Sequence, residues 1–335
     1  MIVIVGGGFS GNSAHNQNKD SIIIDRKDYF LLTPWLIDFI CGMKTLNDII
    51  IKYKNVIVGE LEKIDFNDKK IILSNSKEIR YDKLILALGH HQNLPRLKGP
   101  REYAHKIETL QDAFYLKKRL NEVKDIAIVG GGATGVELAG NIRGKRVTLI
   151  QRRNRLLPTM TTASSKKAEE ILNELGVNLM LGVEAIEVLK DGVLTSHGKV
   201  KSELTIFAGG LKGPQIIDTL QHANKNHRMI VDRYLKSVEH KDVYGAGDCI
   251  TFEDSDIPMS ADVAVSSGKI AMRNALGEEI KFEPKRSATI IRIRDEFFGD
   301  FGNNYVEGNF AKLLRSIAYA ESLLLPSKES FNTKI

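Results

Sequence analysis

The chain has 335 residues, 42 % of them hydrophobic and 27 % charged, which is ordinary for a globular protein of two or three domains. The net charge of +6 suits an anionic partner, but no nucleic-acid-binding signature accompanies it, so we expect no nucleic-acid partner. No apolar run reaches the ~18 residues of a membrane-spanning helix, and the first residues are typical of a strand rather than a signal peptide. Two cysteines, Cys41 and Cys249, exclude a disulfide scaffold and fit a reducing, cytoplasmic setting.

The chain opens with a β-branched run and a glycine-rich turn, IVIVGGGFSG. In the spacing of Gly6, Gly8 and Gly11, the first glycine permits a tight turn, the second admits a pyrophosphate and the third lets a helix pack closely. A short helix over residues 12–19 leads to a strand that ends in Asp25, 19 residues after Gly6. In such sites a carboxylate about 20 residues on bonds the ribose hydroxyls. The segment therefore predicts a dinucleotide site.

A strand and glycine turn, YDKLILALGHHQNLP from Tyr81 to Pro95, follow a meander of short strands. The turn Ala87–Gly89 is a further candidate contact to a dinucleotide. The His90–His91 pair after it favours a solvated loop over a cofactor contact. None of the eight histidines belongs to a ligand motif, so no metal site is expected.

A second glycine turn, IAIVGGGATG, begins at Ile126 and repeats the spacing with Gly130, Gly132 and Gly135. It also follows a strand-like run, opens a helix and leads to another strand, RVTLI. Two matched copies are far stronger than one and predict two Rossmann-like units. Two bound dinucleotides follow, and the natural pair is FAD and a nicotinamide nucleotide.

The residue at the ribose position of the second copy is a glutamine. Gln151 lies 21 residues after Gly130, and arginines follow at 152, 153 and 155. An acidic residue there would repel a 2′-phosphate, whereas glutamine would not and arginines would attract it. We therefore expect NADPH to be accepted at least as well as NADH. The alternative is that the arginines are solvated and NADH binds through Gln151.

Two later segments complete the pattern. DVYGAGDC, from Asp242 to Cys249, is a strand that ends at Gly247 and Asp248, and Asp248 is a candidate acceptor for hydroxyls of a bound cofactor. PMSADVAVSSGKIAMRNAL, residues 258–276, predicts a helix with Ser260 as its N-cap. The positive end of that helix would suit the flavin's pyrimidine carbonyl.

In this order the segments resemble the pyridine nucleotide–disulfide oxidoreductase flavoproteins, and within them the branch of type II NADH dehydrogenases and sulfide:quinone oxidoreductases. DRKDYFLLTPWLIDFICG, residues 25–42, and TIFAGGLKGP, residues 205–214, carry the specific likeness. The resemblance implies an α/β fold with two Rossmann-like domains of the three-layer ββα type and a small C-terminal α+β cap. It implies an FAD-binding domain over 1–107 and 236–278, an NAD(P)H-binding domain over 108–235, and a cap over 279–335.

The resemblance also implies roles for single residues. FAD would contact Gly6, Gly8, Gly11, Asp25, Arg26, Ala87, Gly89, Gly247 and Asp248. The nicotinamide nucleotide would contact Gly130, Gly132, Gly135, Gln151 and Arg152. Glu137 matches a family glutamate near the nicotinamide, the alternative being a solvent-facing carboxylate in the first turn of its helix. The implied chemistry is hydride transfer from NADH or NADPH to flavin N5, and then electron delivery to a second acceptor.

The acceptor is left open by the sequence. No Cys-x-x-Cys pair exists, and the favoured interpretation of Cys41 and Cys249 is two inert thiols. A sulfur-handling flavoprotein that uses Cys41 is one alternative, and an FAD-binding protein with little turnover is another. Quinone is a candidate, although both glutamines of the family's quinone-facing Ala-Gln-x-Ala-x-Gln pattern are replaced in residues 261–266.

The segment 310–325, FAKLLRSIAYAESLLL, predicts an amphipathic helix whose apolar face does not reveal its partner. A membrane surface, the preceding strands and a second subunit all fit, and the resemblance favours peripheral contact with the inner face of the cell membrane. We also expect a homodimer.

Overall fold

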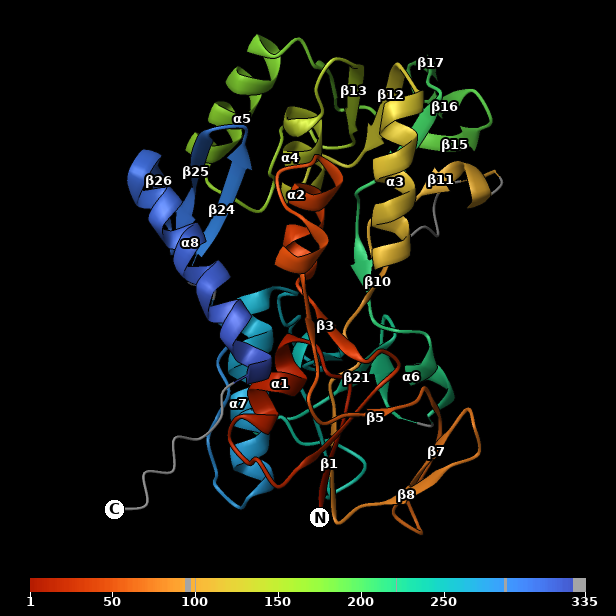
Figure 1. The fold of residues 1–335 in the computed structure, drawn as a ribbon, viewed down its shortest axis with the longest axis vertical. Coiled ribbons are helices and arrows are strands. Elements are labelled where there is room, and N and C mark those ends of the chain that lie inside the picture. Colours follow the sequence, from red (N-terminus) through yellow and green to blue (C-terminus); the bar gives the residue numbers. More distant parts are fainter. Residues whose placement is uncertain (94–97, 100, 221, 286–287, 328–335) are drawn as a thin grey trace.

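The computed structural model describes residues 1–93, 98–99, 101–220, 222–285 and 288–327. The chain forms two α/β lobes, one above the other in Figure 1, and a C-terminal element that lies along one side of both. This confirms the expected architecture of two Rossmann-like units and a small α+β cap.

The first lobe is built on a five-stranded parallel sheet in the order β22-β9-β1-β2-β5. Its strands are nearly continuous apolar runs because helices or further strands cover both faces. The strands are β1 (Ile2–Val5), β2 (Ile22–Asp25), β5 (Ile57–Val58), β9 (Lys83–Leu86) and β22 (Val243–Gly245). Helix α1 (Phe9–His15) follows β1 and packs against α7 (Ala261–Ala275).

Short antiparallel sheets and a helix surround this sheet. They comprise β3 (Tyr29–Leu31) with β4 (Ile50–Lys52), β6 (Leu61–Asp65) with β7 (Lys70–Leu73) and β8 (Glu78–Arg80), β10 (His91–Gln92) with β19 (Leu211–Lys212), the mixed group β20 (Asn224–Lys225), β21 (Arg228–Ile230) and β23 (Ile250–Thr251), and α6 (Ile216–Thr219).

The second lobe repeats the design with the parallel order β11-β18-β12-β13-β14. The strands are β11 (Ala104–His105), β12 (Asp125–Val129), β13 (Arg146–Gln151), β14 (Asn178–Leu181) and β18 (Leu204–Phe207), and an antiparallel sheet of β15 (Ala185–Leu189), β16 (Gly192–Thr195) and β17 (Gly198–Lys201) adjoins them. Its helices are α3 (Leu110–Glu122), α4 (Ala133–Asn141) and α5 (Thr162–Glu174). A capping box of Thr109 and Asp112 begins α3.

The C-terminal element is an antiparallel sheet followed by a long helix. It contains β24 (Ala288–Ile293), β25 (Glu296–Phe301), β26 (Asn304–Glu307) and α8 (Gly308–Leu324). At its far end α8 contacts the first lobe, where the Asn16 side chain donates a hydrogen bond of 2.8 Å to the Leu325 carbonyl. The helix therefore spans the junction of the lobes (Figure 1). Among the described residues, no helix combines the length and apolarity that crossing a membrane requires.

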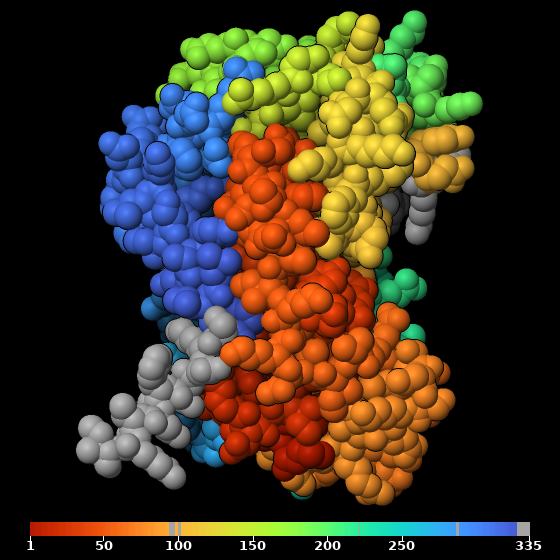
Figure 2. Space-filling model, viewed as in Figure 1, coloured from red at the N-terminus to blue at the C-terminus, as the bar shows by residue number. Residues whose placement is uncertain are grey.

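Helix α2 (Leu36–Ile40) belongs to the first lobe by sequence but packs on the second. The Phe39 ring meets that of Phe114 on α3 edge to face, and Lys117 donates to the Phe39 carbonyl. Figure 2 shows this segment in orange between α3 in yellow and the C-terminal element in blue. One continuous apolar core thus joins α2, the second lobe and the C-terminal sheet.

The structure places one proposed domain boundary differently. The resemblance implies a second domain that extends to residue 235, yet Ile217, Met229 and Leu235 lie in the core of the first lobe. Strand β21 also pairs with β23, which directly follows Asp248. The chain therefore returns to the first lobe near residue 211 rather than 236. Of the segment 81–95, the residues Leu94 and Pro95 lie outside the described part.

Candidate dinucleotide sites

A cleft of about 950 Å³ opens on the first lobe and reaches the junction with the second. That volume is at the upper end of the range for ligand sites. Eight of the expected site residues line it: Gly6, Gly8, Asp25, Arg26, Ala87, Gly89, Glu137 and Asp248. The other expected residues do not line it: Gly11, Gly130, Gly132, Gly135, Gln151, Arg152, Gly247 and Cys41. Of the second glycine turn, Ala133 and Thr134 do reach the cleft.

Of the three motif glycines in the first turn, the fold needs Gly6 and Gly11, whereas Gly8 faces open space. A Cβ atom on Gly11 would lie 1.8 Å from the Gly6 carbonyl oxygen, and one on Gly6 would lie 2.1 Å from the Ala87 carbonyl oxygen. Gly6 also has φ +106°, which favours glycine. A Cβ on Gly8 would have no atom within 4 Å, and the φ of −71° at Gly8 suits any residue. Neither the packing nor the backbone of the protein itself therefore requires glycine here. The space beside Gly8 is therefore room for a ligand.

Asp25 already fixes this turn and retains acceptor capacity. Its Oδ2 accepts a hydrogen bond of 2.7 Å from the Gly7 amide, and its Oδ1 accepts one of 2.9 Å from the Lys27 amide. A carboxylate has about four lone-pair sites, so two hydroxyl groups could still be bound. The Tyr53 hydroxyl and the Asn12 amide both donate to the Gly7 carbonyl. Tyr53 was not foreseen, because it lies 46 residues from Gly7 and carries no motif.

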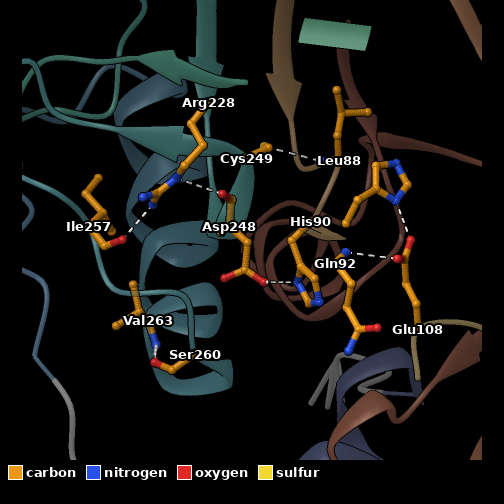
Figure 3. Close-up of polar contacts among 12 residues, drawn as sticks. Leu88, His90, Gln92, Glu108, Arg228, Asp248, Cys249, Ile257, Ser260 and Val263 are labelled. Carbon is orange, nitrogen blue, oxygen red and sulfur yellow. Dashed lines mark hydrogen bonds and ion pairs between the residues drawn. The ribbon is translucent and has the colours of Figure 1, made fainter. Parts of the chain in front are cut away.

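Asp248 presents an unpartnered oxygen to the same cleft. Its Oδ2 is 2.7 Å from Nδ1 of His90, whereas its Oδ1 is buried and has no hydrogen-bond partner among the described residues (Figure 3). A buried acceptor without a partner costs about 1–3 kcal/mol. A cofactor hydroxyl would remove that cost. Three features therefore fit FAD: the open space at Gly8, the unused acceptor sites of Asp25 and the unpartnered Oδ1 of Asp248.

His90 and His91 are not the solvated pair that the sequence favoured. His90 pairs with Asp248, and His91 pairs with Glu108, whose other oxygen accepts 2.9 Å from the Gln92 amide (Figure 3). Burial raises the pKa of Glu108, but its bonds to His91 and Gln92 outweigh this and lower the pKa to about 2. The turn after β9 is thus fixed by two histidine–carboxylate pairs.

The His90–Asp248 pair predicts a pH dependence. Burial lowers the pKa of His90, but the hydrogen bond and charge of Asp248 outweigh it and raise that pKa above its ordinary value. The pair's stabilisation is therefore complete below about pH 6.5 and is lost as pH rises through the folded-state pKa. We expect His90→Gln to lower the unfolding free energy of FAD-depleted protein by about 1–2 kcal/mol at pH 5.5 and by less at pH 9.

Urea titrations of both proteins at several pH values measure this difference. His197→Gln is the matched control, because the exposed His197 ring bonds the Ser196 hydroxyl of the adjacent residue and no carboxylate within the described part of the chain. A difference that stays constant or widens toward pH 9 would contradict the assignment.

Helix α7 directs its N-terminus at the cleft. Ser260 is its N-cap and accepts from the Val263 amide, as expected. Ser260, Ala261 and Ala264 line the cleft, whereas Asp262 does not. The partial positive charge of the helix end therefore faces the cleft, and Asp262 does not line that surface.

The second glycine turn has the same geometry as the first. Gly130 has φ +118°, a Cβ on Gly135 would lie 1.8 Å from the Gly130 carbonyl oxygen, and a Cβ on Gly132 would meet nothing within 4 Å. Gln151 takes the place of Asp25, because its Oε1 accepts 3.3 Å from the Gly131 amide. The open side of Gly132 is therefore room for a second pyrophosphate.

The arginines after Gln151 differ in availability. Arg155 donates to the carbonyls of Pro158 and Met160, so its guanidinium is held within its own loop. Arg152 is largely exposed, and its guanidinium lies 3.9 Å from the Glu184 carboxylate. Arg153 is exposed as well. Of the three, Arg152 and Arg153 are the ones able to meet a 2′-phosphate.

Glu137 is buried, not solvent-facing, and it belongs to a charged cluster at the lobe junction. Its Oε1 accepts 2.6 Å from Nη1 of Arg315 on α8 and 2.8 Å from the Arg292 amide. Nη2 of Arg315 reaches Oδ2 of Asp38 at 3.4 Å, and Arg292 lies 3.9 Å from the other oxygen. Asp38 is 1 % exposed and Glu137 6 %. Two carboxylates from different lobes are thus balanced by two C-terminal arginines.

This cluster borders the cleft through Glu137 and Arg315. Burial raises the pKa of Glu137, while Arg315 opposes that shift. The sequence indicated Glu137 but not Arg315. No local signal could have found the pair, since 178 positions separate the two residues.

The cysteines are poor nucleophiles. Burial and the nearby carboxylates of Asp38 and Glu137 raise the pKa of Cys41 to about 12. Burial raises the pKa of Cys249 to about 11, and its sulfur lies 3.4 Å from the Leu86 carbonyl oxygen. Reactive cysteines have lowered pKa values. The structure therefore supports two inert thiols.

Comparison with known proteins agrees with this geometry. The sequence profile of a family described as pyridine nucleotide-disulphide oxidoreductase matches residues 1–268. A type II NADH:quinone oxidoreductase of Staphylococcus saprophyticus is 22 % identical over 82 % of this chain and 81 % of its own.

Two solved structures share the fold. NDH2 from Plasmodium falciparum, in complex with NADH, superposes with a TM-score of 0.86 at 19 % identity, covering 96 % of this chain and 94 % of its own. The sulfide:quinone oxidoreductase of Aquifex aeolicus gives 0.82 at 18 % identity, covering 97 % and 91 %.

Proposed function

The chain belongs to the pyridine nucleotide-disulphide oxidoreductase family, and from that premise we propose that it is an FAD-dependent NAD(P)H dehydrogenase. The observation that carries the proposal is the pair of equivalent glycine turns, each with open space at its middle glycine. FAD supplies the hydride-accepting chemistry once bound, and the nicotinamide nucleotide supplies the hydride.

The protein's own residues would bind and orient these groups. Asp25 and the Gly7–Gly8 backbone would hold the adenosine half of FAD, and Asp248 with its free Oδ1 would hold a hydroxyl nearer the flavin. Glu137, on the first turns of α4, would face the nicotinamide side at the lobe junction. The N-terminus of α7 would favour negative charge on the reduced cofactor.

Anaerobic reduction tests the proposal. The purified protein should show a flavin spectrum that bleaches on addition of NADH or NADPH. A protein that takes up FAD but is bleached by neither would instead be the FAD-binding protein with little turnover. Bleaching by sulfide that Cys41→Ser abolishes would favour the sulfur alternative, which the raised pKa of Cys41 argues against.

The nicotinamide preference has its own prediction. Because Gln151 carries no charge and Arg152 is exposed beside it, we expect NADPH to reduce the flavin at least as efficiently as NADH. Arg152→Ala should lower kcat/KM for NADPH about 10-fold, or ~1.4 kcal/mol, and leave NADH nearly unchanged. Stopped-flow reduction with both nucleotides measures this. Arg155→Ala is the matched control, because the Arg155 guanidinium already donates to carbonyls of its own loop. A strong NADH preference in the wild type and in both variants would refute the expectation.

We propose quinone as the second acceptor. The Staphylococcus relative is a NADH:quinone oxidoreductase by name, and the surface of α7 at the cleft consists of Ala261 and Ala264 rather than the charged Asp262. The two missing glutamines make oxygen the main rival. Mixing anaerobically reduced protein with a short-chain quinone or with oxygen compares them, and reoxidation faster with oxygen would contradict the quinone.

The outer face of α8 supports a docking role. Phe310, Leu313, Ile317 and Leu324 are each about half exposed, although they form one stripe along the helix. The inner face is held instead by Arg315 and by Tyr319, whose hydroxyl donates to the Asp48 carbonyl. We propose that the stripe lies on the inner face of the cell membrane, with a homodimer contact as the rival occupant.

Substitution on the stripe separates binding from folding. We expect Leu313→Ser with Ile317→Ser to weaken sedimentation with anionic vesicles at least about 10-fold and to leave stability within about 0.5 kcal/mol, since the side chains are already exposed. Unchanged vesicle binding would contradict the membrane proposal. If the double variant lost a dimer that the wild type forms, and neither protein bound vesicles, the stripe would be a contact with a second subunit. Equilibrium sedimentation measures the dimer.

A further inference from the structure

A side-chain cluster far from the glycine turns contains an unusual buried histidine. The side chain of His222, just before β20, is 1 % exposed. Its Nε2 has no hydrogen-bond partner among the described residues, and its Nδ1 has only a long contact of 3.4 Å to the Ser237 hydroxyl. Burying a polar nitrogen without a hydrogen-bond partner costs free energy, and a bound ligand would remove that cost.

Two further ligand-type residues lie beside it. One nitrogen or oxygen from each of His222, Glu239 and His240 falls within 4.8 Å of the others. Oε2 of Glu239 is 3.7 Å from Nδ1 of His222. Bonds of about 2.0–2.2 Å in a tetrahedral zinc site place neighbouring ligand atoms roughly 3.3–3.5 Å apart. Side-chain shifts of about 1 Å would therefore bring the three into one coordination sphere.

The surrounding contacts hold these side chains in place. The Ser237 hydroxyl accepts from the amides of Glu239 and His240, at 3.2 and 3.1 Å, which fixes the turn that carries both. The Phe66 ring stacks on His240 at 3.9 Å and meets His222 edge to face. The Ala223 amide donates to Oε2 of Glu239 and thereby ties the two ligand segments together. These contacts thus hold the three side chains close together before any ion binds.

The donor set suits a divalent cation, because it combines imidazole nitrogens with a carboxylate oxygen. Neutral imidazole is the form that binds metals. The His240 ring adds a second imidazole nitrogen, and Glu239 adds a carboxylate oxygen.

We propose that His222, Glu239 and His240 bind one divalent transition-metal ion, best matched by zinc, with water in the remaining position. Two imidazoles and a carboxylate are a common ligand set for this ion. None of the three residues lines the cleft, so the ion would have no part in hydride transfer. It would link the segment before β20, which carries His222, to the segment before β22, which carries Glu239 and His240. Strand β22 leads to Asp248.

Zinc titration of the full-length protein tests the proposal. After treatment with a chelator and gel filtration, the protein is titrated with zinc against a chromophoric competitor whose zinc complex absorbs away from the flavin bands. We expect one zinc per chain with micromolar or tighter affinity, in FAD-loaded and FAD-depleted protein alike. Glu239→Gln and His240→Ala should weaken binding at least about 30-fold and abolish the rise in Tm that zinc gives the wild type.

The controls keep the test independent of folding. Glu239 is 42 % exposed, so its substitution leaves the core intact, whereas His222→Ala risks unfolding and is not decisive. His227→Ala is the matched control, because His227 pairs with Asp218 at 2.5 Å outside the cluster. Failure of the wild type to bind zinc would overturn the proposal, and so would binding that Glu239→Gln and His240→Ala leave unchanged.

Discussion

Gly132→Val is expected to abolish flavin reduction by NADH and NADPH while the protein folds and retains FAD. The φ of −79° at Gly132 suits valine, and a Cβ there meets no atom within 4 Å, so the folded chain itself does not resist the change. The side chain would occupy the space of the pyrophosphate. We expect kcat/KM to fall at least about 100-fold, which corresponds to ~2.8 kcal/mol.

Gly8→Val provides the matched control for this change. By the equivalence of the two turns it should lose FAD and leave nicotinamide nucleotide binding intact. FAD content by absorbance, and nucleotide binding to each variant by calorimetry, measure the two effects. Retained flavin reduction in Gly132→Val would show that the second turn does not hold the nucleotide. Loss of both cofactors from either variant would show that the sites are not separable.

The second large effect is expected at the lobe junction. Arg315→Met would leave Glu137 and Asp38 buried with Arg292 as the remaining arginine of the cluster, 3.9 Å from the Asp38 carboxylate. Removing one partner of a buried ion pair costs about 3–5 kcal/mol, because a charge stays behind without compensation. We expect a loss of that size in urea unfolding, together with a lower Tm.

A second substitution tests the electrostatic origin of this loss. Glu137→Gln removes one of the stranded charges, so the double variant with Arg315→Met should be more stable than Arg315→Met alone. Lys312→Met, at an exposed position one turn earlier on α8, should change stability by less than about 0.5 kcal/mol. If the double variant were no better than the single one, the cluster would owe its stability to packing rather than to charge balance.

The local parts of the sites were predictable from the sequence. The glycine spacing, Asp25 and Gln151 follow from the backbone geometry of a strand–turn–helix unit, which is encoded within about 25 residues. The N-cap Ser260 is equally local. Asp248 was inferred from its place after a strand, and the structure adds that one of its oxygens has no protein partner.

The contacts between distant segments were not predictable. Arg315 reaches Asp38 across 277 positions, and no periodicity marks either residue. The apolar face of a surface helix usually packs on the core. In α8 the apolar stripe faces outward and Arg315 faces inward, so the sequence pattern alone would predict the wrong orientation of the helix. The early return to the first lobe was missed because β20, β21 and β23 have only two or three residues each, too few for a sequence pattern.

The two-sided character of α8 affects how truncated forms of this protein should be interpreted. Deleting the helix would remove Leu313 and Ile317 from the surface and, in the same step, remove Arg315 from Glu137. A shortened chain that fails to reduce its acceptor would therefore not reveal whether membrane attachment is needed. Point substitutions on one side of the helix at a time keep anchoring and catalysis as separate variables.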